Sequence, residues 1–269
     1  MELELLNFLI PLLITGLISG LIAGLLGVGG GIIIVPVVYY ILNFNNISSD
    51  IIMHISVASS IGVIFFTSLT SIYTHYKLNN IDKTVISKWF IGTILGSIFG
   101  ALTASFISDR ILVIIFVIIA IIISINMLFN KKIIISKDFP KNIFINNLIS
   151  FIIGYLSVII GIGGGSFSVP TLIAFRKNIY KAIGTSATIG FFIALPGLIT
   201  YGYADIENLP KYSLGYVNVP IVISIALTSI FTAPLGAKLS KKINSKLLKK
   251  IFAIFLLFTC LSLLINQLF

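Results

Sequence analysis

Apolar runs of about 20 residues follow one another along this 269-residue sequence, and each is long enough to cross roughly 30 Å of hydrocarbon as a helix. The strands of a membrane β-barrel would instead alternate apolar and polar residues. Only 10% of the residues are charged, against roughly 25% in a soluble domain. The sequence therefore predicts an all-α, polytopic integral membrane protein with helices near 5–26, 51–76, 89–107, 111–129, 143–160, 182–203, 216–236 and 251–268.

A glycine-rich segment occurs twice within these apolar surroundings. GVGGG at 27–31 is followed by Val35-Pro36, and GIGGG at 161–165 is followed by Val169-Pro170. Lipid penalises a backbone group without a hydrogen-bond partner by several kcal/mol, so broken helices persist where protein or a watery cavity satisfies them. Two such breaks at matching positions predict a transport site.

The duplication extends beyond the glycines. Ala58-Ser59-Ser60 aligns with Gly184-Thr185-Ser186, and Gly100-Ala101 aligns with Gly236-Ala237. We therefore expect a first membrane repeat at 1–129, a linker at 130–142 and a second membrane repeat at 143–269.

Corresponding loops of the two repeats differ in charge, which predicts that the repeats are inverted. Basic residues mark cytoplasmic loops, and all of the 18 lysines and arginines except Arg110 and Lys211 fall in the linker or in one loop of each pair. This predicts a multi-pass membrane protein with both termini on the extracytoplasmic side. The basic loops are 77–88, 176–181 and 237–250, and their counterparts are 204–215, 43–50 and 103–110.

This sidedness requires 5–42 and 143–175 each to enter and leave on the same side, so each is expected to be a hairpin that turns at its glycines. Whether the hairpin arms are re-entrant or cross the membrane fully stays open. Glycines at every fourth position, 16, 20 and 24 and then 92, 96 and 100, predict close helix packing.

A glycine-rich turn that opens a short helix presents backbone N–H groups at the positive end of the helix dipole, which suits an anion. The candidate backbone donors are Gly29, Gly30, Gly31, Gly163, Gly164 and Gly165, the candidate hydroxyl donors are Ser59, Ser60, Thr185 and Ser186, and the candidate structural hinges are Gly27, Pro36, Gly161 and Pro170. Two alternatives remain: the glycines only permit a tight turn, and the hydroxyls bond to a carbonyl of their own or a neighbouring helix.

Several other functions are disfavoured. The glycine segment lacks the Lys-Ser/Thr ending of a phosphate loop, and no span holds a metal-ligand cluster, a nucleophile with its base or paired carboxylates, so we expect no enzyme, metal or cofactor. The net charge of +10 lies in short loops, which argues against nucleic acid. His54 and His75 align with Tyr180 and Tyr201 and are expected to have interfacial or packing roles.

The doubled GxGGG and Val-Pro pattern, together with Gly184-Thr185-Ser186, resembles the sulfite exporter TauE/SafE family of membrane anion transporters. The resemblance implies transport of a small sulfur-containing or organic anion, sulfite-like or sulfonate-like, across the inner membrane by alternating access. Ser59 departs from the threonine that the pattern would have there, but keeps the hydroxyl. An anion channel and a non-transporting membrane scaffold are the alternatives, and the expected partners are a small anion and the lipid bilayer, with the oligomeric state open.

Overall fold

The computed structural model describes residues 2–45, 47, 50–129, 134–136, 138–206, 209–240 and 245–268. Over these residues it contains ten helices and one two-stranded antiparallel sheet. The elements are α1 (Glu2–Leu26), α2 (Gly31–Phe44), α3 (Ile52–Lys77), α4 (Lys83–Phe106), α5 (Asp109–Phe129), α6 (Ile143–Ile159), α7 (Gly165–Ala174), α8 (Ile179–Gly202), β1 (Ser213–Leu214), β2 (Val217–Asn218), α9 (Val219–Leu239) and α10 (Ser245–Leu268).

The apolar runs are helices, so the predicted all-α polytopic membrane class is confirmed. In the part of the chain that the structure describes, six helices are long and apolar enough to cross a membrane: α1, α3, α4, α5, α8 and α9. The helices after the two glycine breaks are shorter, with 14 residues in α2 and 10 in α7. At 1.5 Å per residue they span roughly 21 Å and 15 Å, less than the hydrocarbon thickness.

Asparagine and aspartate side chains begin several of the helices. Asp82, Asn142, Asn178 and Asn218 each precede a helix and accept a hydrogen bond from a backbone N–H of its first turn. Such caps satisfy amides that have no partner inside the helix. The apolar runs thus become helices with sharply defined starts.

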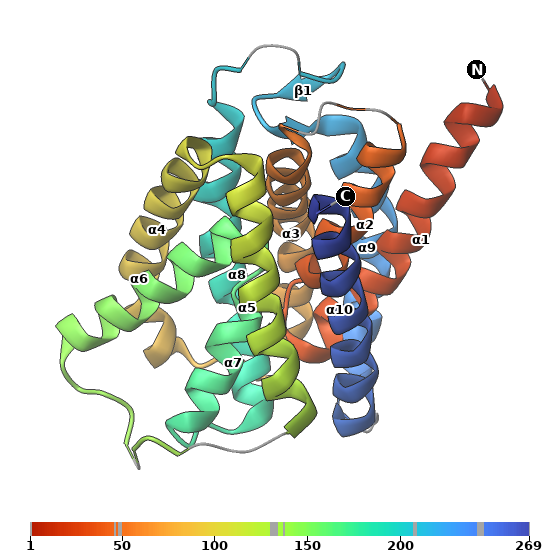
Figure 1. Cartoon of the computed structure of the whole chain (residues 1–269). Coiled ribbons are helices and arrows are strands. Elements are labelled where there is room, and N and C mark those ends of the chain that lie inside the picture. The colour runs from red at the N-terminus through yellow and green to blue at the C-terminus, as the bar shows by residue number, and fades with distance from the viewer. Residues whose placement is uncertain are drawn as a thin grey trace.

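Successive helices run in alternating directions through the bundle (Figure 1). In that view α1 descends, α2 rises, α3 descends, α4 rises and α5 descends. The second part of the chain follows the opposite order: α6 rises, α7 descends, α8 rises, α9 descends and α10 rises. The β1–β2 hairpin lies at the upper end of the bundle in this view, where β2 contacts α3, α8 and α9 (Figure 1).

The glycines at every fourth position of α1 and of α4 form a groove on each helix. Each groove packs against a helix from a distant part of the chain. A Cβ added at any of these glycines would meet backbone or side-chain atoms of the facing helix at contact distances that no real side chain shows. The predicted role in helix packing is therefore confirmed. On α1, Gly16 faces Thr228, Gly20 faces Ser229 and Gly24 faces Ala233 of α9; on α4, Gly92 faces Asn147, Gly96 faces Phe151 and Gly100 faces Tyr155 of α6.

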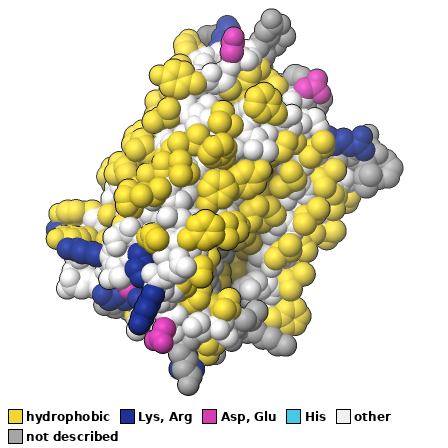
Figure 2. Space-filling view, turned by 90° about the vertical axis from the view of Figure 1, so that its left-hand side faces the viewer, with side chains coloured by type: hydrophobic (Ala, Val, Ile, Leu, Met, Phe, Trp, Pro, Cys, Tyr) yellow, Lys and Arg dark blue, Asp and Glu magenta, His cyan; other side chains and the backbone are white. Residues whose placement is uncertain are grey.

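The outside of the bundle is apolar where it would meet lipid. Isoleucines such as Ile118 and Ile122 on α5 are 54% and 60% exposed. Figure 2 shows hydrophobic side chains spread over the middle of one face, with charged side chains gathered towards its ends. A soluble protein rarely exposes so large an apolar surface, so this surface suits a bilayer.

Candidate functional site

Both glycine segments break a helix and reverse the chain through backbone conformations that favour glycine. The first break lies between Leu26 and Gly31, and the second lies between Ile159 and Gly165. Gly30 and Gly164 precede α2 and α7 with φ values of 79° and 72°. Residues with a Cβ pay a steric cost in this left-handed region. We call residues 27–30 the first glycine loop and residues 160–164 the second.

The two glycine loops touch each other through their backbones. A Cβ built on Gly29 would lie 2.7 Å from the Cα of Gly163, and one built on Gly163 would lie 2.8 Å from the Cα of Gly29. A Cβ at Gly31 would collide with the carbonyl oxygen of Gly161, and one at Gly165 with that of Gly27. The two backbones therefore cross so closely that only glycine, which has no side chain, fits at these positions.

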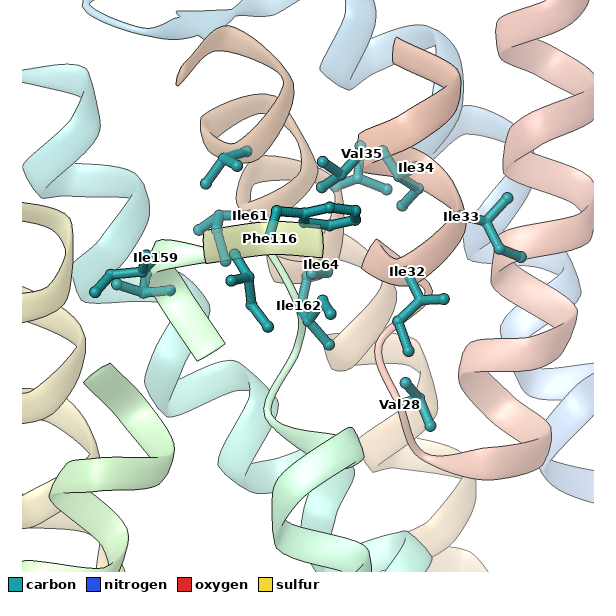
Figure 3. Packing of buried hydrophobic residues seen from close by; sticks show 14 of the residues in the cluster. Val28, Ile32, Ile33, Ile34, Val35, Ile61, Ile64, Phe116, Ile159 and Ile162 are labelled. Atoms are coloured by element: carbon teal, nitrogen blue, oxygen red, sulfur yellow. The ribbon is translucent and has the colours of Figure 1, made fainter. Parts of the chain in front are cut away.

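Apolar side chains surround the crossing. Figure 3 shows Val28 on the first loop and Ile162 on the second, together with Ile61 and Ile64 of α3 and Ile32 of α2. All five side chains are at least nine-tenths buried. The crossing therefore lies in the core of the bundle.

Ser60 and Ser186 hold the loops from the opposite halves of the chain. The Ser60 hydroxyl on α3 donates to the carbonyl of Gly161 at 2.7 Å, and the Ser186 hydroxyl on α8 donates to the carbonyl of Gly27, also at 2.7 Å. Both serines are fully buried. A hydroxyl has one proton, so in this conformation these two are used by the loops.

Ser59 and Thr185 anchor the starts of two helices. The backbone N–H of Asn218 donates to Ser59 Oγ at 3.1 Å, and the backbone N–H of Asp82 donates to Thr185 Oγ1 at 2.8 Å. The same Asn218 and Asp82 cap α9 and α4. Both hydroxyls act as acceptors here.

Most of the predicted backbone donors are unpaired. Within the described part of the chain, the N–H groups of Gly29, Gly30, Gly31, Gly163 and Gly165 have no hydrogen-bond acceptor. Gly164 differs, because its N–H donates to the carbonyl of Ile162 at 2.8 Å. The unpaired groups lie at the positive ends of the α2 and α7 dipoles, where a negative charge is stabilised.

Pro36 and Pro170, the other candidate hinges, lie inside α2 and α7. A proline has no N–H to donate to the carbonyl four residues earlier. Each short helix therefore lacks one of its hydrogen bonds within two turns of its glycine loop. This weak point lies at the same place in both halves.

A small cavity adjoins the crossing. Its volume is about 10 Å³, about enough for one water molecule, and both glycine loops contribute to its wall. No lining residue carries an ionisable side chain. The lining residues are Ala23, Gly27, Gly29, Ile64, Thr67, Ser68, Ser71, Gly163, Ala187 and Gly190.

Three hydroxyls of α3 line this cavity, and the sequence analysis missed them. Thr67 and Ser68 donate to carbonyls of their own helix, whereas the Ser71 hydroxyl has no partner within the described ranges. Ser71 follows Ser68 by three residues and Thr67 by four, which places it beside both on α3, and this spacing is the signal that could have found them. The search for paired residues passed over them because Ile193, Ala194 and Gly197 occupy the corresponding positions of α8.

His54 forms a buried link between helices away from the cavity. Its Nδ1 lies 2.9 Å from Asp109 Oδ1, its Nε2 lies 3.0 Å from the carbonyl oxygen of Ala104, and its ring stacks on Tyr216. These contacts join α3 to α4 and α5, which agrees with the packing role expected for this histidine. In the described part of the chain, no three His, Cys, Asp or Glu side chains are grouped closely enough to hold a metal ion.

Asp82 and Lys177 form an ion pair at the end of the bundle where α4 and α8 begin, with 2.8 Å between Oδ2 and Nζ. Burial alone would raise the pKa of Asp82, but Lys177 and the N–H groups of Val85 and Thr84 outweigh it and hold the pKa below its usual value. The carboxylate is therefore charged at neutral pH. It links the loop before α4 to the loop before α8.

Comparison with known proteins agrees with this architecture. The family model described as sulfite exporter TauE/SafE matches residues 12–263. A "probable membrane transporter protein" of Haemophilus influenzae is 31% identical over 248 residues, which cover 89% of this chain and 92% of the relative. A protein with the same description in Methanocaldococcus jannaschii is 31% identical over 250 residues, covering 93% of this chain and 92% of the relative.

A third relative, a "probable membrane transporter protein" of Bacillus subtilis, is 26% identical over 251 residues, covering 86% of this chain and 88% of the relative. No solved structure matches the chain. The family model covers nearly the whole chain, including both glycine loops and the cavity between them. The chain therefore belongs to the sulfite exporter TauE/SafE family, and it is a multi-pass membrane transporter rather than an enzyme.

Proposed function

We propose that this transporter moves a small oxyanion, sulfite-like or sulfonate-like, and binds it where the two glycine loops cross. One observation carries the proposal: unpaired N–H groups of both loops occur at the crossing, and Gly29 and Gly163 line a cavity without an ionisable side chain. Backbone donors at two helix N-termini stabilise an anion without a lysine or arginine. The sulfur-containing substrate class comes from the description of the family.

The substrate enters when the helices around the cavity part. The cavity has about the volume of one water molecule, and a sulfite ion is larger. In this proposal the structure corresponds to a closed state of the transport cycle. The proposed donors are the N–H groups of Gly29, Gly30, Gly31, Gly163 and Gly165, while Ser60 and Ser186 position the loops that present them.

Inverted repeats, 1–129 and 143–269 joined by the linker 130–142, are part of this proposal. Each helix of the first repeat runs opposite to its counterpart in Figure 1, as α3 and α8 do, which supports the inversion. Alternating access then exposes the crossing first to one side and then to the other. The lysine-rich loops are cytoplasmic and both termini are extracytoplasmic. Cysteines introduced at Asn45 and Lys177 should react from opposite sides of the membrane, and reaction from the same side would refute the inversion.

The test is anion binding and flux with the purified full chain. Sulfite at 100 times its dissociation constant should stabilise the protein by about 2.7 kcal/mol, and proteoliposomes should accumulate sulfite with saturation kinetics. Sulfoacetate, sulfate and small carboxylates complete the panel. Gly30→Val should abolish flux while the protein still inserts, because a β-branched residue strains the left-handed backbone at this position.

Two results would redirect the proposal. Single-channel conductance far above the turnover of a transporter would make the protein an anion channel. Absence of both anion stabilisation and flux in the wild type would make the glycine loops purely structural, as expected of a scaffold.

A further inference from the structure

Among the residues that the structure describes, two buried side chains of α3 have hydrogen-bonding groups without partners, on the side of the cavity towards the end of α3. Ser71 lines the cavity and is 3% exposed, and its hydroxyl has no partner. His75 lies one helical turn further on and is fully buried, and its Nε2 has no partner. Side chains four residues apart are neighbours on a helix. The polar face of α3 thus extends from the cavity towards Lys77.

The His75 ring offers a donor rather than an acceptor at Nε2. The side-chain nitrogen of Asn80 lies 3.4 Å from His75 Nδ1, and an amide nitrogen can only donate. Nδ1 therefore accepts, and in the neutral ring Nε2 carries the proton. The carbonyl of Gly24 lies near the ring without completing a hydrogen bond to Nε2. No charged side chain among the described residues is hydrogen-bonded to His75.

The second half of the chain completes the equivalent contact. Tyr201 aligns with His75, and Val158 aligns with Gly24. The Tyr201 hydroxyl donates to the carbonyl of Val158 at 3.1 Å. Gly197, which aligns with Ser71, has no side chain to offer. The unpaired donors of Ser71 and His75 therefore have no equivalents at the corresponding positions of α8, so the fold of the repeat does not require them.

We propose that the Ser71 hydroxyl and the His75 Nε2–H form a second oxyanion subsite, on the path between the glycine loops and the lysine-rich end of the bundle. The subsite rests on the proposed function and adds a second binding position for the transported anion. An oxyanion has several acceptor atoms, so one anion can accept from both donors when α1 and α3 part. Unpaired buried donors are costly, which gives the subsite its preference for an occupant with acceptors only.

The test measures sulfite flux in proteoliposomes for single variants of the full chain. Ser71→Ala and His75→Phe each remove one unpaired donor, and each should lower the flux at least about tenfold. Ser56→Ala is the matched control, because Ser56 is also buried on α3 but lies outside the cavity, and its hydroxyl already donates to the carbonyl of Ile52. Its flux should stay within about twofold of wild type, since no free donor is lost. His75→Gln keeps an N–H donor and should restore most of the flux that His75→Phe loses.

A further variant introduces into the first half the hydrogen bond that Tyr201 makes in the second half. His75→Tyr should donate to the carbonyl of Gly24, as Tyr201 does to Val158, and should slow the flux without lowering the melting temperature. Sulfite should still stabilise all of these variants, because the glycine loops are intact. Flux in Ser71→Ala and His75→Phe equal to that in Ser56→Ala would overturn the subsite and leave the proposed function standing. A wild type without flux or stabilisation would overturn both.

Discussion

The two glycine loops are held in the same way, but the surfaces on either side of their crossing differ. Each loop receives a serine hydroxyl from the opposite half at 2.7 Å. On α3, however, Thr67, Ser68 and Ser71 line the cavity, whereas α8 has Ile193, Ala194 and Gly197 at the same places. The two loops are thus held alike, whereas the surfaces that α3 and α8 present beside the crossing have diverged.

The strongest test of equivalence replaces the glycines at the crossing. Gly31→Ala and Gly165→Ala each place a methyl group against a carbonyl of the other loop, so both should lower anion flux at least about 100-fold, or roughly 2.7 kcal/mol of transition-state stabilisation. Gly202→Ala is the control, because its nearest contact is Leu214 at 4.0 Å. Proteoliposome flux checks the prediction, and a large loss in only one of the pair would break the equivalence.

The serines that hold the loops should also act as a matched pair. Ser60→Ala and Ser186→Ala each leave a buried carbonyl with one donor fewer, and each should lower the free energy of unfolding by about 1–3 kcal/mol. Denaturant titration in detergent measures both. Ser56→Ala is the control, because that hydroxyl bonds only within its own helix. Clearly unequal costs for the two serines would mean that the loops are held differently.

The difference between the α3 and α8 surfaces beside the crossing can be measured by thiol accessibility. In a Cys260→Ala background, which removes the single native cysteine, Ser68→Cys should react with an impermeant reagent added from the lysine-rich side. Ala194 has the position on α8 that Ser68 has on α3. Ala194→Cys should react about tenfold more slowly with reagent added from the opposite side, since an apolar surface opens less often to water. Equal rates from the two sides would remove the asymmetry.

The smallest expected effect concerns the helix caps. Asp82 and Asn218 have the same place in the two halves, but only Asp82 is charged and paired. Because its pKa is lowered in the fold, its contribution is complete above the usual carboxyl pKa and is lost as the pH falls through the lowered value. Asp82→Asn should cost up to about 1 kcal/mol at neutral pH and should flatten the acid limb of a thermal stability profile. An unchanged acid limb would show that Asp82 does not contribute to it.

The helices were predictable because the length of an apolar run is a local property. The two glycine loops were found because each is a contiguous segment with a copy elsewhere in the chain. The contact between Gly29 and Gly163 and the role of Ser60 were not predictable, since Ser60 and its acceptor Gly161 are 101 positions apart. The missed hydroxyls of α3 have no copies in α8, so a search guided by the duplication passed over them.

The packing of α1 against α9 also governs how the protein is made. The Thr228 hydroxyl of α9 donates to the carbonyl of Leu13, 215 positions earlier in the chain. During synthesis the glycine groove of α1 therefore enters the bilayer long before the helix that fills it exists. Until α9 is inserted, Gly16, Gly20 and Gly24 of α1 lack their packing partner, so the first half completes its packing only after most of the second half has been made.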